Sequence, residues 1–491
     1  MNAGADKYKP YNIKQQKEVA IFRDERYNKK NNDKTGVNIS VKYGGGYMDI
    51  ISRLEQVRVS RFHYRLLVLT GLGWLFDAMD TGIIAFVLPV LAKEWTLSAA
   101  QVGFIGSIGL LGMALGAVLA GSAADKWGRK AVFSVTLLIY SMATGLCGLA
   151  WNYESLLAFR FLVGFGLGGE LPVAATLMSE YSPAASRGRF VVLLESFWAG
   201  GWLAAALISY LIIPYYGWKM AFFIGALPAL YVFFIRLAMP ESIRYLLTKG
   251  RQTEALAIVA RIEQAAGVSP AAQPVAASKA AAPATPVTKL AFSELWASPY
   301  AKRTILLWVI WFGIVYSYYG IFTWLPSLLV NQGNTVIKTF EYVLIMTLAQ
   351  LPGYFSAAYL VDRIGRKATL AAYLALSAVS AYCFGQGGSA GMVLFWGSMM
   401  SFFNLGAWGV VYTYTPELYP TRIRAFGSGW AAAVGRFGGI LAPTIVGYLI
   451  TGPQGFSQVF TMFTGVMLGV AVIVWLFAEE TKNRTLDEIS R

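Results

Sequence analysis

The sequence predicts an all-α membrane protein with twelve transmembrane helices, arranged as two pseudo-symmetric bundles of six. Composition is the first indication, because 56% of the 491 residues are hydrophobic and only 14% are charged, against about 25% charged in a typical soluble domain. The second is a repeat, since a set of charged, glycine and proline residues recurs 237 positions further on. The third is that basic residues gather in alternate connections between the apolar runs.

The repeat indicates two long copies of one unit, each about half of the chain. Seven residues keep the same displacement, in the pairs Asp125 and Asp362, Gly128 and Gly365, Arg129 and Arg366, Lys130 and Lys367, Glu180 and Glu417, Pro183 and Pro420, Arg187 and Arg424. This period is far longer than the roughly 20–50 residues of solenoid or propeller repeats. Duplicated membrane halves related by an axis along the membrane normal are known among secondary transporters.

The N-terminal segment, residues 1–65, is expected to lie in the cytoplasm. Residues 1–47 are rich in Lys, Asn and Tyr without apolar periodicity, so this stretch is expected to be disordered. Met48 begins a short amphipathic helix. Two interpretations stay open: Met48 is the natural start, or the preceding residues form a cytoplasmic tail.

The apolar runs that follow are long enough to span a bilayer, which takes about 20 residues. Twelve such runs are expected, at 66–92, 100–123, 130–150, 154–178, 189–212, 218–238, 304–330, 340–361, 367–387, 391–414, 425–450 and 457–478. They form an N-terminal bundle over 66–238 and a C-terminal bundle over 304–478. A cytoplasmic linker, 239–303, separates the bundles, and a cytoplasmic tail, 479–491, ends the chain.

The basic residues predict the orientation. They fill the second, fourth, sixth, eighth and tenth connections, whereas the other connections offer little beyond Lys93, Lys219 and Lys338. Because Lys and Arg are enriched in cytoplasmic loops, both termini are expected in the cytoplasm, with the protein in the cell (inner or plasma) membrane. The same distribution explains the net charge of +15 without nucleic-acid binding. The single histidine, His63, and the two cysteines offer no metal-ligand spacing, so neither a metal nor another cofactor is expected.

The repeated loop motifs read Asp125-Lys-Trp-Gly128-Arg-Lys130 and Asp362-Arg-Ile-Gly365-Arg-Lys367. The two glycines are expected to allow a sharp turn with positive φ. The charges are expected to form a latch at the cytoplasmic surface, with Asp125 accepting hydrogen bonds from a neighbouring helix N-terminus. The pairs Glu180 with Arg187 and Glu417 with Arg424 are expected to belong to the same latch.

These motifs, together with Pro240-Glu-Ser-Ile-Arg244 after the sixth run, resemble those of the major facilitator superfamily. The resemblance covers both halves, from about residue 66 to 485. It implies the two-bundle major facilitator fold and alternating access, in which the latch holds the cytoplasmic side shut and opens once per cycle.

Two carboxylates lie inside the first span. Asp77 is about 16 Å from Leu66 at 1.5 Å per residue, and Asp80 is three residues further, on an adjacent part of the same face. Charges at this depth are costly and therefore functional candidates. Two neighbouring carboxylates repel each other, so we expect at least one to hold its proton near neutral pH, as proton coupling requires.

The other charges within spans are candidates of different kinds. Arg436 stands at mid-depth in an apolar helix, and its planar guanidinium suits a carboxylate. The expected partner is a substrate carboxylate, Asp77 or Asp80 across the halves, or each in turn, and Arg436 is expected to bind substrate. Glu170 and Arg160 in the fourth span are buried charges of uncertain role. Glu195 is expected to be shallower and to join the cytoplasmic network.

Aromatic residues make up 15% of the chain and offer ring-binding side chains in the fifth, seventh and tenth spans. Trp202, Tyr316, Tyr319 and Trp408 are expected to hold a flat ring in a central cavity.

The segment Asp77-Ala-Met-Asp80 is similar to the Asp-x-x-Asp element of the aromatic-acid:proton symporters and of bacterial niacin transporters. Ala78-Met79 departs from the Gly-Tyr common in the aromatic-acid branch, which favours the niacin type. Gly435-Arg436-Phe-Gly-Gly also resembles that group. Sugar porters share the loop motifs but usually carry paired glutamines where Tyr316-Ser-Tyr-Tyr-Gly320 stands.

The resemblance implies a proton-coupled importer of a small aromatic or heteroaromatic carboxylate, such as nicotinate. A sugar or organic-cation transporter of the same superfamily and a non-transporting membrane receptor or sensor stay open as alternatives. No nucleophile–base or metal constellation is present, so an enzyme is not expected. The expected partners are the substrate, a proton and the lipid bilayer, with the protein a monomer.

Overall fold

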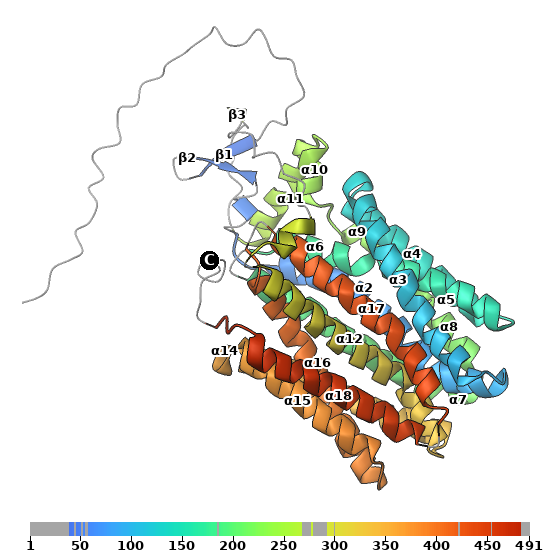
Figure 1. The fold of residues 1–491 in the computed structure, drawn as a ribbon. Helices are drawn as coiled ribbons and strands as arrows, with labels where there is room; N and C mark the ends of the chain where they lie inside the picture. The colour runs from blue at the N-terminus through green and yellow to red at the C-terminus, as the bar shows by residue number, and fades with distance from the viewer. Residues whose placement is uncertain are drawn as a thin grey trace, which may run out of the picture.

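The computed structural model describes residues 39–43, 46–50, 53–54, 57–183, 186–267, 276–277, 292–298, 300–420, 423–452 and 454–482. Long helices dominate these residues and run side by side (Figure 1). Those of the first half are α2 (Arg61–Glu94), α3 (Ala99–Trp127), α4 (Arg129–Gly148), α5 (Tyr153–Leu167), α6 (Glu170–Tyr181), α7 (Arg187–Tyr216), α8 (Trp218–Gly225), η1 (Leu227–Leu230) and α9 (Tyr231–Ala238). Those of the second half are α12 (Tyr300–Asn331), α13 (Val336–Leu348), α14 (Gln350–Ile364), α15 (Arg366–Gly385), α16 (Ala390–Glu417), α17 (Arg424–Leu449) and α18 (Gly455–Phe477).

Eleven helical stretches among the described residues are long and apolar enough to cross a membrane. The span expected at 154–178 is not among them, and it is divided at Gly168-Gly169 into α5 and α6. Two further spans are also interrupted, between α8 and α9 and between α13 and α14. Each interruption precedes a proline, Pro172, Pro228 or Pro352, that cannot donate a helical hydrogen bond to the preceding turn. The predicted all-α class with two six-helix bundles is confirmed.

The two halves pack by the same rules. In the first half α2 packs along α7, and in the second α12 packs along α17. Between the halves α3 contacts α17, and α7 correspondingly contacts α13. The most buried spans are α2 and α12, each with 78% of its apolar window inside the protein, against 28–61% for the others. The first helix of each half therefore lies at the centre of the molecule.

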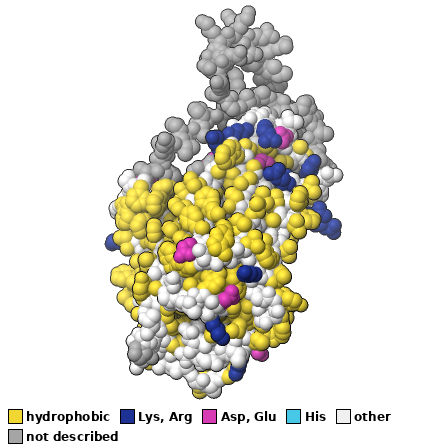
Figure 2. Space-filling view, turned by 90° about the vertical axis from the view of Figure 1, so that its right-hand side faces the viewer, with side chains coloured by type: hydrophobic (Ala, Val, Ile, Leu, Met, Phe, Trp, Pro, Cys, Tyr) yellow, Lys and Arg dark blue, Asp and Glu magenta, His cyan; other side chains and the backbone are white. Residues whose placement is uncertain are grey.

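The outer surface is apolar, with hydrophobic side chains forming a broad band (Figure 2). Leu237, Phe233 and Trp475 are 87%, 69% and 60% exposed. Exposed apolar area on this scale would aggregate in water but suits hydrocarbon. The chain is a multi-pass membrane protein.

Helices α10 (Ile243–Thr248) and α11 (Gln252–Ala265) follow the first half and lie at the upper end of the view in Figure 1. A short 3-10 turn, η2 (Phe292–Trp296), precedes α12. Part of the stretch expected to be disordered carries regular structure: β1 (Ile39–Tyr43) pairs antiparallel with β2 (Gly46–Asp49) and with β3 (Ala276–Ala277). Residues 1–38, which include the rest of that expectation, lie outside the described residues.

The N-terminal segment is attached to α11 by a buried ion pair. The Arg53 guanidinium donates two hydrogen bonds to the Glu263 carboxylate, at 2.8 and 2.5 Å. Both side chains are almost fully buried, with 5% and 1% of their surface exposed. Ile50, Leu54 and Val57 are buried beside them.

We predict that Glu263→Gln will detach this segment, because removing one partner leaves the Arg53 charge buried without compensation. Breaking a buried pair costs roughly 3–5 kcal/mol, so amide hydrogen exchange around residues 53–57 should accelerate by roughly 100-fold to 5000-fold. The exposed pair of Arg251 and Glu254, 48% and 56% exposed, provides the control. Glu254→Gln should change exchange little, and equal effects of the two variants would contradict the prediction.

Candidate functional site

The repeated loop motifs form matching turns at one end of the two bundles. Gly128 lies between α3 and α4 with φ of +99°, and Gly365 lies between α14 and α15 with φ of +100°. Residues other than glycine rarely adopt this conformation. The expected sharp turns with positive φ are confirmed.

Each turn is held by a glutamate from the end of the same half. The Glu241 carboxylate accepts hydrogen bonds from the backbone N–H groups of Arg129 and Lys130, at 2.8 and 3.3 Å. Glu480 does the same for Arg366 and Lys367, at 2.9 and 3.1 Å. A carboxylate at a helix N-terminus satisfies unpaired donors and meets the positive end of the helix dipole.

This role was expected of Asp125, and the structure gives it to Glu241 instead. Asp125 pairs with Arg129 at 2.8 Å and is 74% exposed. The sequence signal for the true partner was the acidic residue at the end of each half, in Pro240-Glu241-Ser242 and Glu479-Glu480-Thr481. At each of the two turns, sequence clusters that lie over a hundred residues apart in the chain meet.

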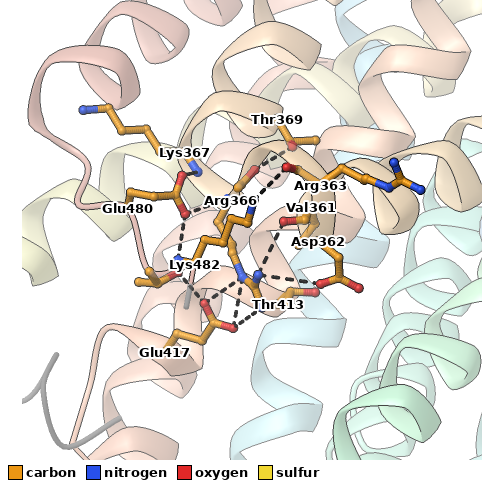
Figure 3. Close-up of polar contacts among 12 residues, drawn as sticks. Val361, Asp362, Arg363, Arg366, Lys367, Thr369, Thr413, Glu417, Glu480 and Lys482 are labelled. Atoms are coloured by element: carbon orange, nitrogen blue, oxygen red, sulfur yellow. Dashed lines mark hydrogen bonds and ion pairs between the residues drawn. The ribbon is translucent and has the colours of Figure 1, made fainter. Parts of the chain in front are cut away.

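The second acidic pair of the motif completes this network. Glu180 accepts a hydrogen bond from the Ser242 hydroxyl and Glu417 one from the Thr481 hydroxyl, both at 2.5 Å. Figure 3 shows the second-half network, in which Arg366 binds Glu417 at 3.0 Å and approaches Asp362 at 3.7 Å.

These contacts all join elements of the same half. Arg424 donates to the Tyr419 carbonyl oxygen at 3.3 Å. The Arg187 side chain lies outside those that the structure describes.

A second group of charges lies deep in the first half. Asp80 accepts a hydrogen bond from Thr144 at 2.6 Å and pairs with Arg160 at 2.8 Å. Arg160 is 5% exposed and Asp80 is fully buried. Asp80 is therefore a compensated charge, and Arg160 is its partner.

Asp77 has a different environment. It is fully buried, and neither of its oxygens has a hydrogen-bond donor among the described residues; the same holds for both oxygens of Glu170. Asp77 and Glu170 influence each other electrostatically, with Asp80 a weaker influence on Asp77. The Glu170 carboxylate lies against α2 at Gly73, one turn before Asp77. Asp80 was expected to be the carboxylate that interacts with Asp77, but the carboxylate that faces Asp77 is Glu170.

Aromatic side chains from both halves meet beside these carboxylates. The Trp198 indole N–H donates to the Tyr318 hydroxyl at 2.9 Å, joining α7 to α12. The Tyr318 ring lies 6.0 Å from Trp202, 5.4 Å from Tyr319 and 5.1 Å from Trp408. We call these five residues the central aromatic cluster. Tyr318 and Trp198 were not among the residues expected to bind a ring.

Tyr316 does not join the cluster, although it was expected with the others. Its hydroxyl donates to the Met462 sulfur at 3.1 Å, and its ring packs on Phe463 at 5.6 Å. Both partners belong to α18. Tyr316 and Tyr318 are two positions apart in the chain, so they point to different sides of α12 and Tyr316 meets another neighbour.

Arg436 and Glu195 approach the cluster from opposite halves. The Nη1 atom of Arg436 is buried without a hydrogen-bond partner among the described residues, and the guanidinium lies near Tyr319 and Tyr412. Glu195 is 2% exposed and lies near the same two tyrosines. Glu195 was expected to join the cytoplasmic network, but the contacts described above for the two loop-motif networks do not include it, and α7 places it at the interface between the halves. Tyr319 is influenced electrostatically by Asp77 as well as by Arg436.

The halves are closed at the end opposite the loop motifs. The Ser107 and Thr444 hydroxyls are 2.9 Å apart, and a Cβ atom at Gly103 or Gly447 would collide with the backbone of the other half. Between this closed end and the aromatic cluster, a cavity of about 20 Å³ is lined by residues that include Thr81, Arg160 and Tyr319. This is room for about one water molecule.

Comparisons with known proteins give consistent matches. The family model described as sugar (and other) transporter matches residues 27–491. The niacin transporter NiaP of Acinetobacter baylyi is 58% identical over 442 residues, which cover 90% of this chain and 100% of that protein. A Bacillus subtilis relative, also named NiaP, is 46% identical over 424 residues, covering 86% and 98%. The partially occluded inward open structure of the E. coli xylose transporter XylE matches with a TM-score of 0.70 over 87% of this chain and 100% of that chain, at 18% identity, which supports the fold.

We predict that Gly128→Ala will destabilise the protein, because its φ of +99° and ψ of 155° are nearly restricted to glycine and cost roughly 1–3 kcal/mol otherwise. The new Cβ would also collide with the Glu241 carboxylate. Gly121→Ala is the matched control, since its Cβ meets nothing within 4 Å and alanine favours the helix. Thermal unfolding of the purified protein should show a lower melting temperature for Gly128→Ala only. A melting temperature equal to that of Gly121→Ala would show that the turn bears no strain.

Proposed function

Because the chain belongs to the sugar (and other) transporter family of the major facilitator superfamily, we propose that it imports a small heteroaromatic carboxylate, with nicotinate the leading candidate, by proton-coupled alternating access. The resemblance inferred from the sequence, including that to bacterial niacin transporters, is confirmed. The family and these relatives are transporters, not enzymes.

One observation carries the substrate class: the buried Arg436 guanidinium nitrogen without a partner, beside an aromatic cluster. A buried guanidinium needs an anion, and a carboxylate fits its planar fork. Trp202, Tyr319 and Trp408 hold the ring of the substrate while Arg436 binds its carboxylate. An organic cation is disfavoured at this place because it would meet the guanidinium.

The proton is carried by Asp77 and Glu170 rather than by Asp77 and Asp80. Two uncompensated carboxylates in an apolar interior cannot both be ionised, so at least one of them holds a proton. Asp80 is already compensated by Arg160 and Thr144, so it positions Arg160 and the neighbouring helices. Both carboxylates of the Asp77–Glu170 pair lie in the first half, across the interface from Arg436.

Substrate and proton are coupled through Tyr319, which lies near Arg436 and Asp77. An anion bound at Arg436 brings negative charge toward Asp77 and favours its protonated form. By reciprocity, protonation of Asp77 favours anion binding by the same factor. The two ligands therefore bind together, which is the requirement for symport.

Alternating access requires that the closed end and the loop-motif end open in turn. The contact of Ser107 with Thr444 closes one end; by the distribution of basic residues this is the extracellular end, with both termini in the cytoplasm. The loop-motif networks then act at the cytoplasmic end. The described contacts of each network stay within one half. This is the arrangement expected when a latch between the halves is released.

We predict that Arg436→Ala will weaken nicotinate binding by roughly 2–5 kcal/mol, the usual loss for a buried charged partner, but nicotinamide binding by only about 1 kcal/mol, the value of a neutral hydrogen bond. Calorimetry on the purified protein measures both ligands. Arg436→Lys should rescue poorly, because the bidentate fork is lost.

Tyr316→Phe is the control for ring-binding substitutions such as Trp408→Ala, because Tyr316 packs against α18 outside the cluster. It should bind nicotinate like the wild type.

Equal weakening of nicotinate and nicotinamide by Arg436→Ala would assign carboxylate recognition to another residue. Binding without uptake into proteoliposomes would instead favour a receptor.

We predict that Asp77→Asn and Glu170→Gln will each abolish accumulation driven by a pH gradient while exchange of substrate across the membrane continues. Each variant removes the shared proton without adding charge. Radiolabelled uptake and counterflow in proteoliposomes measure the two activities. Asp80→Asn is the comparison, and it should lower the melting temperature because Arg160 loses its partner. Undiminished uphill uptake in the double variant Asp77→Asn/Glu170→Gln would remove this pair from coupling.

A further inference from the structure

A cavity of about 970 Å³ lies beside the first half at the loop-motif end, away from the central aromatic cluster. Three walls enclose it. The first turns of α2 form one wall, the junction of α9 with α10 forms the second, and one face of α11 forms the third. The α11 residues that line it, Glu254, Ile258, Arg261 and Ala265, follow the spacing of a single helical face.

Positive charge dominates this cavity. Five basic residues and two acidic residues line it; the basic ones are Arg61, Arg65, Lys130, Arg251 and Arg261. Both acidic residues already have hydrogen-bond partners within the protein. Glu254 binds Arg251 with two hydrogen bonds of 2.6 Å, and Glu241 binds backbone N–H groups at the loop-motif turn.

Three guanidinium groups therefore remain for a ligand. Arg61, Arg65 and Arg261 have no ion-pair partner among the residues that the structure describes. Arg61 and Arg65 are one helical turn apart on α2, and Arg261 faces them from α11. Such a cluster suits an anion with several oxygens, since guanidinium groups bind phosphate in bidentate geometry.

The cavity changes from basic to apolar within about one helical turn, or about 5.4 Å. Leu69 follows Arg65 on the same face of α2, and Leu66, Leu237 and Met239 line the same region. Leu237 is 87% exposed and belongs to the hydrophobic outer surface. On the face in Figure 2, Lys and Arg side chains gather at the upper end, directly above the hydrophobic band.

We propose that this cavity binds an anionic phospholipid, with the phosphate on Arg61, Arg65 and Arg261 and an acyl chain along Leu66, Leu69 and Leu237. A soluble phosphate compound would use the guanidinium groups but not the apolar wall. A zwitterionic lipid would use the wall but leave the net positive charge uncompensated. Bound in this way, the lipid bridges α2, the central helix of the first half, to α11 of the linker.

The test measures lipid binding to the purified, delipidated full chain by native mass spectrometry and by thermal shift. Phosphatidylglycerol should bind more tightly than phosphatidylcholine and should raise the melting temperature further. Basic residues near a membrane surface contribute roughly 1 kcal/mol each toward anionic lipid. The double variant Arg61→Gln/Arg65→Gln should therefore bind phosphatidylglycerol on the order of 10-fold to 30-fold more weakly, with phosphatidylcholine unchanged.

The control removes two charges from the same end of the protein without touching the cavity. Arg189 and Lys302 are exposed and do not line it, so Arg189→Gln/Lys302→Gln should keep the phosphatidylglycerol affinity of the wild type. Equal losses in the two double variants would reduce the preference to general surface charge and overturn the proposal. Competition by sn-glycerol 3-phosphate at concentrations similar to the lipid would show a soluble phosphate site and would also overturn it.

A second measurement uses the wild-type protein alone, so it does not depend on the variants folding. Phosphatidylglycerol with a photoreactive acyl chain should crosslink to peptides containing Leu66–Leu69 or Leu237–Met239. Unlabelled phosphatidylglycerol should compete for this labelling, and phosphatidylcholine should not. Crosslinks found only on other helices would place the lipid elsewhere and reject the site.

Discussion

An apolar interior accepts a charge only where another group compensates for it, and this constraint organises the molecule. Arg160 and Thr144 compensate the charge of Asp80, and Glu263 compensates the charge of Arg53. Asp77, Glu170 and the Nη1 atom of Arg436 have no hydrogen-bond partner among the described residues. These uncompensated groups lie near the interface between the halves, where the proposed substrate anion and proton would supply what the chain does not.

The duplication gives the two halves one packing scheme but different chemistry. Both halves close their loop-motif turn with a glutamate on helix N–H groups, through Glu241 and Glu480. At the centre the symmetry is broken: α2 and the helices beside it carry buried acids, whereas α17 carries a guanidinium whose Nη1 atom is buried. A shared scaffold allows the halves to move as similar rigid units, and the unlike centres provide opposite charges across the interface.

Sequence patterns indicated which helices exist, and packing decided which residues meet. Glu170 is 93 positions from Asp77 in the chain, and no spacing rule connects them. Tyr316 and Tyr319 looked equivalent in one span, yet they face different neighbours. The reason is that these helices are apolar on nearly all sides, so periodicity does not show which face turns inward.

The sequence by itself determined the membrane class, the duplication and the glycine turns, because these depend on composition and spacing. Only the tertiary structure decided that Glu170 faces Asp77, that Glu195 lies at the interface, and that Glu241 rather than Asp125 binds the helix end. Each of these depends on the rotation and crossing of helices distant in the chain. Those angles follow from packing the whole bundle at once, which local sequence does not encode.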